Sequence, residues 1–188
     1  MIELVEYKPE WPKVFEQLRD DLMPHVADLT SRIEHVGSTA VPGLPAKPAI
    51  DLAIVVETGS DLLIATERLV SLGYMHRHNL STPDRRAFKV AGTAHNLYVC
   101  LRDGISLHNH LTFRDHLRTH PVASAQYAAL KWELVRKFPD NKCEYIEGKT
   151  AFILSILERC GTSKEVLDSI RESNRILYLG LRKEQDTL

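Results

Sequence analysis

The strongest constraint on the fold is a nearly continuous apolar run at residues 49–56, which is rich in branched side chains and contains one charge, Asp51. A run of this kind is typical of a central strand that is buried on both faces. A lone carboxylate in such a strand is costly unless it is paired, hydrogen-bonded or bound to a metal. We therefore expect a functional Asp51, against the simpler alternative of a strand-end aspartate satisfied by backbone N–H groups or by Lys47.

The segment before this strand, residues 37–48, holds two glycines and three prolines, which predicts a loop with a fixed path. Gly37 allows the backbone to approach a ligand, and Ser38 and Thr39 add hydroxyls beside backbone N–H groups that can bind an anion. Lys47 adds a positive charge, either as a phosphate contact or as a solvated loop lysine. The segment predicts a site for phosphate and metal, and the alternative is a tight turn with a hydroxyl cap.

Hydrophobic periodicity predicts helices and strands along the rest of the chain. The expected helices are residues 11–26, 62–72, 107–117, 123–138, 145–160 and 166–177, and the expected strands are residues 3–7, 32–36, 49–56, 74–79, 86–90 and 96–101. No long helix separates the last three strands, so we expect them to be antiparallel neighbours. The pattern predicts an α+β fold, in which a mixed β-sheet is flanked by helices and the C-terminal third is helical. We expect one domain at residues 1–160 and a helical extension at residues 161–188.

Composition excludes several classes of protein. Lys and Arg number 24 and Asp and Glu number 25, so the net charge of −1 argues against a protein that coats nucleic acid, although a local basic pocket is compatible with it. The three cysteines are far apart and do not suggest a disulfide framework or a zinc knuckle. The sequence has no signal-like N-terminal run and no apolar stretch long enough to cross a bilayer, so we expect a cytoplasmic protein without a membrane contact.

The chain has a Gly-Ser pair that is followed, about a dozen residues later, by an aspartate on a strand. This pattern resembles the nucleotidyltransferase superfamily of the polymerase-beta type. A more specific resemblance is to the GrpB family, an uncharacterised protein family, and it covers roughly residues 5–160. The segment that carries it is HVGSTAVPGL at residues 35–44, followed by Ala46-Lys47-Pro48 and Ile50-Asp51. Supporting motifs are Tyr7-x-Pro9-x-Trp11, His95-Asn96-Leu97-Tyr98-Val99, Leu111-x-Phe113-Arg114-Asp115, Tyr127, Leu130-Lys131, and Tyr145 with Lys149 and Phe152-Ile153.

The resemblance implies a nucleotidyltransferase-like fold and a divalent metal, Mg or Mn, together with a nucleotide. In that superfamily Gly-Ser holds the triphosphate and strand carboxylates hold two metals that stabilise the attacking and leaving oxygens. Carried over to this chain, Gly37 and Ser38 would contact phosphate and Asp51 would hold metal. Lysines of the helical region often contact triphosphate in the superfamily, which points to Lys131 and Lys149. The alternative for both lysines is a stem that packs on the core while its amine reaches solvent.

The chain departs from the enzyme pattern at two positions. The second carboxylate usually lies two residues after the first, where this chain has Ala53, and the strand at residues 96–101 lacks the usual third one. We therefore expect His95, at the start of that strand, to join Asp51 as a metal ligand or proton acceptor. Arg114 either reaches the phosphates or, as we favour, ties its helix to the sheet through ion pairs.

Three functions follow as hypotheses. The leading one is a protein that binds a phosphorylated small molecule, most simply a nucleotide, with a divalent metal, and that transfers a nucleotidyl group to a small-molecule hydroxyl or amine. The alternative is a non-catalytic module that assists a partner enzyme of coenzyme A metabolism, because GrpB members also occur fused to dephospho-coenzyme A kinases. The third is a histidine-based hydrolase or metal protein on the same scaffold, for which His116 and His120 share a helix face but show no third ligand.

Overall fold

The computed structural model of the chain describes residues 1–30, 32–78 and 81–185, with side chains as far as residue 175. Within these residues one sheet has the strand order β1-β2-β5-β4-β3. The strands are β1 (Ile33–Val36), β2 (Ile50–Val56), β3 (Met75–His76), β4 (Arg85–Lys89) and β5 (His95–Leu101). β2 and β5 are parallel and the other pairs are antiparallel, which confirms both the mixed sheet and the antiparallel arrangement of β3, β4 and β5. Asn79 of the predicted strand at 74–79 lies outside the described residues.

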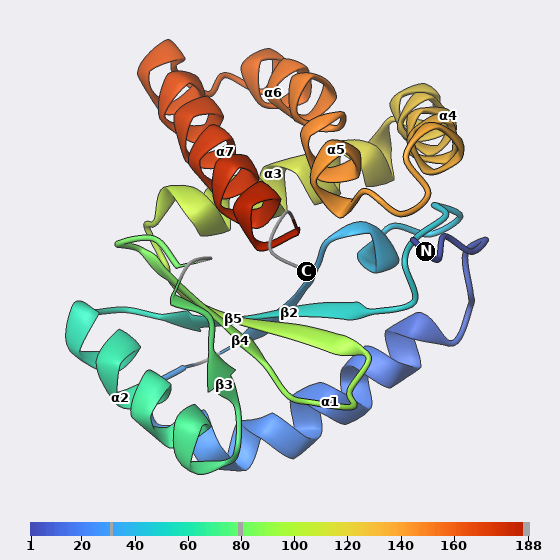
Figure 1. Ribbon diagram of the computed structural model, residues 1–188. Helices are drawn as coiled ribbons and strands as arrows, with labels where there is room; N and C mark the ends of the chain where they lie inside the picture. Colours follow the sequence, from blue (N-terminus) through green and yellow to red (C-terminus); the bar gives the residue numbers. More distant parts are fainter. Residues whose placement is uncertain (31, 79–80, 186–188) are drawn as a thin grey trace.

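Helices cover both faces of the sheet (Figure 1). One face carries α1 (Trp11–Val26) and α2 (Gly59–Ser71). The opposite face carries α3 (Ile105–Thr119), α4 (Pro121–Lys137), α5 (Lys142–Glu147), α6 (Thr150–Arg159) and α7 (Lys164–Gln185). Helix α3 contacts β1 and β5 directly, and α7 packs against α5 and α6. The α+β class and the helical C-terminal third are confirmed. The predicted domain boundary falls in the short connection between α6 and α7 and stays a prediction, and residues 186–188 of the predicted extension lie outside the described part.

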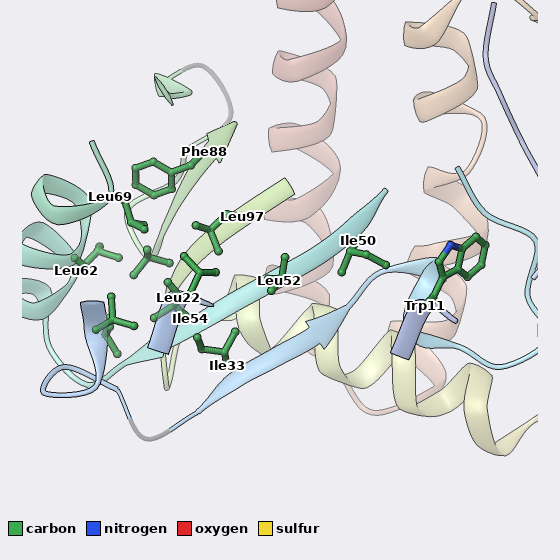
Figure 2. Packing of buried hydrophobic residues seen from close by; sticks show 14 of the residues in the cluster. Trp11, Leu22, Ile33, Ile50, Leu52, Ile54, Leu62, Leu69, Phe88 and Leu97 are labelled. Atoms are coloured by element: carbon green, nitrogen blue, oxygen red, sulfur yellow. The ribbon is translucent and has the colours of Figure 1, made fainter. Parts of the chain in front are cut away.

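Side-chain alternation along β2 divides this strand between two environments. Ile50, Leu52, Ile54 and Val56 are buried against α1 and α2 in the main hydrophobic cluster (Figure 2). The intervening residues face the other way, and Ala53 and Val55 pack in a second cluster with Leu107 of α3. Burial of each large apolar side chain contributes about 1.5–3 kcal/mol, so the register of β2 is strongly fixed. Asp51 has the same parity as Ala53, and the fold therefore turns it toward the C-terminal helices.

Two elements differ from the prediction. The expected helix at residues 145–160 is two helices, α5 and α6, with a break at Gly148. A side chain at Gly148 would collide with Leu134 of α4, so packing between helices holds the chain in a turn that the apolar spacing did not indicate. The expected strand at residues 3–7 is reduced to an isolated bridge between Val5 and Ala46. Among the described residues, no helix has the length and apolar character needed to cross a membrane.

Candidate functional site

The turn after β1 is built around Gly37. Its φ of 72° lies in the left-handed region, where a side chain is strained, and a Cβ at this position would collide with the Asp51 carboxylate. Residues Ser38–Ala40 then form a short 3-10 turn that brings the Ser38 hydroxyl to Tyr127 of α4, with which it hydrogen-bonds. Glycine is therefore needed both for the backbone angle and for close approach, and the turn lies directly against Asp51.

Asp51 lies near the start of β2 and is partly exposed. In the parallel pair of β2 with β5 it stands opposite Asn96, whose Nδ2 donates a hydrogen bond of 2.8 Å to the Asp51 Oδ1. Burial raises the pKa of the Asp51 carboxyl to about 6, against the lowering effect of the Asn96 amide and of nearby lysines. The fold thus keeps a carboxylate where its charge is disfavoured, which is common at sites that bind a ligand.

Three lysines, Lys47, Lys131 and Lys149, surround this carboxylate, and we refer to them as the lysine cluster. The Nζ atoms of Lys47 and Lys149 lie 4.6 Å and 4.4 Å from the ring centroid of Tyr145 in α5. Lys131 is 1% exposed, and it donates a hydrogen bond to the Pro45 carbonyl. Burial, followed by repulsion from neighbouring lysines, lowers the pKa of Lys47 and Lys149 to about 8 and that of Lys131 to about 7. The cluster concentrates positive charge at the Asp51 end of the sheet.

A cleft of about 820 Å³ lies between the sheet and the C-terminal helices. Gly37, Ser38 and Asp51 line it from the sheet side, and Lys149 lines it at the start of α6. Other lining residues come from the β3–β4 connection, β4, α3, α4, α6 and α7, and they include Arg85, Asn109, His110, Phe113, Ser173 and Asn174. The structure thus brings five of the predicted site residues into one concave space, namely Gly37, Ser38, Asp51, Lys149 and Arg114. Lys47 and Lys131 stand behind this lining and act on the cleft through their charge.

His95 does not join Asp51, contrary to the prediction. In the parallel register His95 stands opposite Ile50 and shares its face, so its side chain points toward α1 and α2. There its Nε2 is 3.1 Å from the hydroxyl of Tyr74, and burial lowers the pKa of the imidazole. The residue one position further on, Asn96, is the side chain that reaches Asp51. The prediction placed the strand correctly but assigned the His95 side chain to the wrong face of the sheet.

Thr39 and Arg114 are engaged with the protein itself. Thr39 is buried, and its hydroxyl is 3.0 Å from the Nε2 of His35. Arg114 lines the cleft, but its guanidinium donates to Glu34 at 2.8 Å and to the His35 carbonyl at 2.9 Å, and it also pairs with Asp115. The favoured interpretation of Arg114, an ion-pair network that ties α3 to the sheet, is confirmed. Both residues hold the Gly37–Ser38 turn in place from behind.

The donor set around Asp51 decides which metal arrangement fits. Ala53, where the resemblance predicted a second carboxylate, is fully buried and on the Asp51 face, and the residue opposite Asp51 on the neighbouring strand is an amide, Asn96. Within the described ranges no group of three His, Cys, Asp or Glu side chains is placed to hold a metal. His116 and His120 do share a face, with stacked rings 3.9 Å apart. One carboxylate is enough for a single Mg²⁺ whose other ligands would be phosphate oxygens and water, but it is too few for a pair of metals.

Comparison with solved structures defines the class of the fold. The crystal structure of the conserved protein GrpB from Enterococcus faecalis matches 89% of this chain and 99% of that protein, with a TM-score of 0.75 and 29% identity. A structure of the Cid1 poly(U) polymerase with MgGTP bound matches 86% of this chain and 54% of that protein, with a TM-score of 0.54 and 14% identity. The chain therefore has a nucleotidyltransferase-type fold.

Sequence comparison defines the family. The GrpB protein family matches residues 1–159, and the chain belongs to this family. It is 36% identical over 166 residues to a UPF0157 protein of Pseudomonas aeruginosa, covering 84% of this chain and 67% of that protein. It is 30% identical over 154 residues to the UPF0157 protein YqkA of Bacillus subtilis, of which it spans only 45%. A protein of Mycolicibacterium paratuberculosis named dephospho-CoA kinase is 33% identical over 93 residues, which is 46% of this chain and 23% of that protein.

Proposed function

We propose that the cleft binds a nucleotide through its phosphate groups, together with one divalent cation at Asp51. The observation that carries the proposal is the convergence of the Gly37–Ser38 turn, Asp51 and Lys149 on one cleft. Its volume of about 820 Å³ lies within the range of about 300–1,000 Å³ that is usual for small-molecule sites. The likeness in fold to a poly(U) polymerase with MgGTP bound supports a nucleotide as the ligand.

Each residue has a distinct part in this proposal. The Ser38 hydroxyl and the backbone N–H groups of the turn donate hydrogen bonds to phosphate oxygens. The Lys149 ammonium contacts the same oxygens as a point charge, and Lys47 adds to the field from behind Tyr145. Asp51, whose carboxylate is held in position by the Asn96 amide, would hold one Mg²⁺ or Mn²⁺. The metal, when bound, draws electron density from a phosphate oxygen and so favours attack at phosphorus.

The reaction to test is transfer of the nucleotidyl group from a nucleoside triphosphate to a small-molecule hydroxyl or amine. The acceptor bonds to the α-phosphorus, pyrophosphate leaves, and the acceptor's proton passes to water. The cleft extends from Ser38 to Ser173 and Asn174 on α7, which leaves room for a second substrate beside the phosphates. A non-catalytic module that assists a partner enzyme is the second candidate. It is favoured by the apolar residue at Ala53 and by the match to part of a protein named dephospho-CoA kinase.

A ligand screen by thermal unfolding tests the proposal. Nucleoside triphosphates, coenzyme A precursors and sugar phosphates are each added with and without Mg²⁺ or Mn²⁺. A ligand at a hundred times its dissociation constant adds roughly 2.7 kcal/mol to the free energy of unfolding. We expect a nucleotide to raise the melting temperature of the wild type and to have no effect on Gly37→Val, whose side chain fills the space beside Asp51.

The same screen separates the two candidates. A folded wild-type protein that responds to no nucleotide, with or without metal, contradicts the nucleotide proposal. Capture of a dephospho-coenzyme A kinase that is equally strong with Ser38→Ala and Asp51→Asn would favour the accessory module, since its contact with the partner would then not use the cleft.

A further inference from the structure

Positive charge outnumbers negative charge at the Asp51 end of the cleft. The three ammonium groups of the lysine cluster face one carboxylate, and Lys89 lies close enough to lower the pKa of Asp51 as well. Among the residues that the structure describes, no ion pair joins a carboxylate to Lys47, Lys131 or Lys149. Buried charges are normally paired, so this surplus is a structural cost unless an anion occupies the cleft.

Aromatic rings and a carbonyl, rather than acids, hold the ammonium groups in place. Lys47 and Lys149 lie over Tyr145, and Lys131 lies 5.2 Å from the ring centroid of Tyr127. A cation held over an aromatic ring is stabilised without losing its net charge. Lys131 also donates to the Pro45 carbonyl, which fixes the loop that carries Lys47. The cluster is thus preorganised to present positive charge to a ligand.

The positive charge of the lysine cluster lies beside Asp51, where further carboxylates would be needed to hold a second metal. A second metal would need further carboxylates beside Asp51, and neither Ala53 on its own strand nor Asn96 opposite it on β5 can supply one. Lys149 lines the same cleft as Asp51 and interacts with it electrostatically. A site that lacks the ligands for a second dication has fixed monocations in its place.

We propose that the lysine cluster takes the place of the second metal, so that the cleft binds a diphosphate or triphosphate chain even without a divalent ion. This inference rests on the proposed function for the identity of the ligand as a nucleotide, but its electrostatic content concerns the phosphate chain alone. A chain with two or more negative charges balances the surplus, whereas a nucleoside without phosphate does not. The negative charge of Asp51 then weakens binding of metal-free phosphates, and it would strengthen binding only when a divalent ion is present.

Titration calorimetry with inorganic tripolyphosphate and with ATP, each in EDTA and in Mg²⁺, tests this inference. We expect wild-type protein to bind tripolyphosphate in EDTA and Lys149→Met to bind it at least about tenfold more weakly, the loss expected for a charge-assisted contact. Lys137→Met is the matched control, because Lys137 also lies over an aromatic ring, Phe138, and does not line the cleft. Its dissociation constant should stay within about twofold of the wild type, as distant surface changes do.

Asp51→Asn gives a second test that does not depend on weakening the site. The amide keeps the shape of the side chain and removes the carboxylate charge that faces the lysine cluster, so binding of tripolyphosphate in EDTA should tighten by about fivefold. The same variant should lose the gain that Mg²⁺ gives to the wild type. A site that needs two metals instead predicts no binding of tripolyphosphate in EDTA by either protein, and weaker binding by Asp51→Asn in Mg²⁺.

The outcomes separate this inference from the proposed function. Binding of ATP only in the presence of Mg²⁺, with no effect of Lys149→Met beyond that of Lys137→Met, overturns the inference and leaves nucleotide binding intact. Binding of tripolyphosphate in EDTA without binding of any nucleotide supports the lysine cluster and overturns the nucleotide as ligand. Absence of binding for both probes overturns both.

Discussion

Replacing Asp51 by asparagine should make the protein more stable. In the wild type, burial raises the pKa of this carboxyl from 3.8 to about 6, whereas in the unfolded chain it is an ordinary aspartate. Folding at neutral pH therefore places a charged group where the charge is disfavoured. An asparagine has the same shape, needs no charge, and can accept the hydrogen bond that Asn96 donates at 2.8 Å.

The size of the effect follows from the pKa difference. One pKa unit corresponds to 1.36 kcal/mol, so a shift of about two units is worth up to about 3 kcal/mol. The Asp51 side chain is partly exposed, and screening by water reduces this to about 2 kcal/mol. For a domain of this length, 1 kcal/mol corresponds to about 2–4 °C, so the melting temperature should rise by about 4–8 °C.

The sign of the pH dependence provides the decisive assay. Because the folded pKa is the higher one, the wild type is not penalised below about pH 4 and loses stability as the pH rises from about 4 to about 6. Denaturant unfolding at several pH values should give curves for Asp51→Asn and wild type that agree near pH 4 and separate toward pH 7. Asp103→Asn, an exposed carboxyl on the same cleft, should not separate in this way. A variant no more stable than wild type at pH 7 would refute the reasoning.

Three further predictions use the same unfolding measurements. Gly37→Ala and Gly43→Ala both place a side chain at a positive φ, which costs about 1–2 kcal/mol of folding stability. Only the Gly37→Ala side chain also collides with Asp51, so this variant should be less stable by a further 1 kcal/mol or so and should lose nucleotide affinity. Equal effects of the two variants would contradict the close approach of Gly37 to Asp51. Burial, with Arg118 and Arg114, lowers the pKa of His35 to about 4, so stability should fall by up to about 3 kcal/mol as the pH drops from about 6.5 to 4. Measured in the Asp51→Asn background, His35→Gln should flatten that slope, and an unchanged slope would assign it to other groups. Arg114→Met leaves Glu34 and the His35 carbonyl without the Arg114 donor and should lower the free energy of unfolding by about 3 kcal/mol. Arg175→Met, which breaks an exposed ion pair with Glu172, should change the free energy of unfolding little. Similar losses of stability in both variants would argue against an ion-pair connection between α3 and β1.

Local patterns predicted most of the fold correctly, for identifiable reasons. The helical spacing of Trp11, Leu22 and Val26 and the apolar run of β2 each encode one buried face, which is a property of a short segment. The two-helix arrangement of α5 and α6 was missed because the break at Gly148 depends on Leu134 of another helix. Spacing along one segment carries no information about a contact of that kind.

The candidate site shows the same division. Gly37, Ser38 and Asp51 were predicted from the sequence, because a glycine turn before a strand with one carboxylate is a local pattern. His95 was assigned to the wrong face and Asn96 was missed, since a register shift of one residue inverts every side chain of a strand. Knowledge that β2 pairs with β5 in this register would have been enough to identify Asn96 as the neighbour of Asp51. The role of Tyr145, which lies beneath two lysines, had no sequence signal beyond its place near Lys149.

The parts of the site are far apart in the chain, and this has a consequence for its synthesis on the ribosome. Asp51 precedes Asn96 by 45 residues and Lys149 by 98. At roughly 5–20 residues per second, the carboxylate is translated about 5–20 s before the last of its lysines. The sheet and helices α3 to α5 are translated by the end of this interval, but α6 and α7, which also line the cleft, are translated after it. A ligand therefore recognises only the completed domain, and it would act as a check on finished protein rather than as an aid to the early steps of folding.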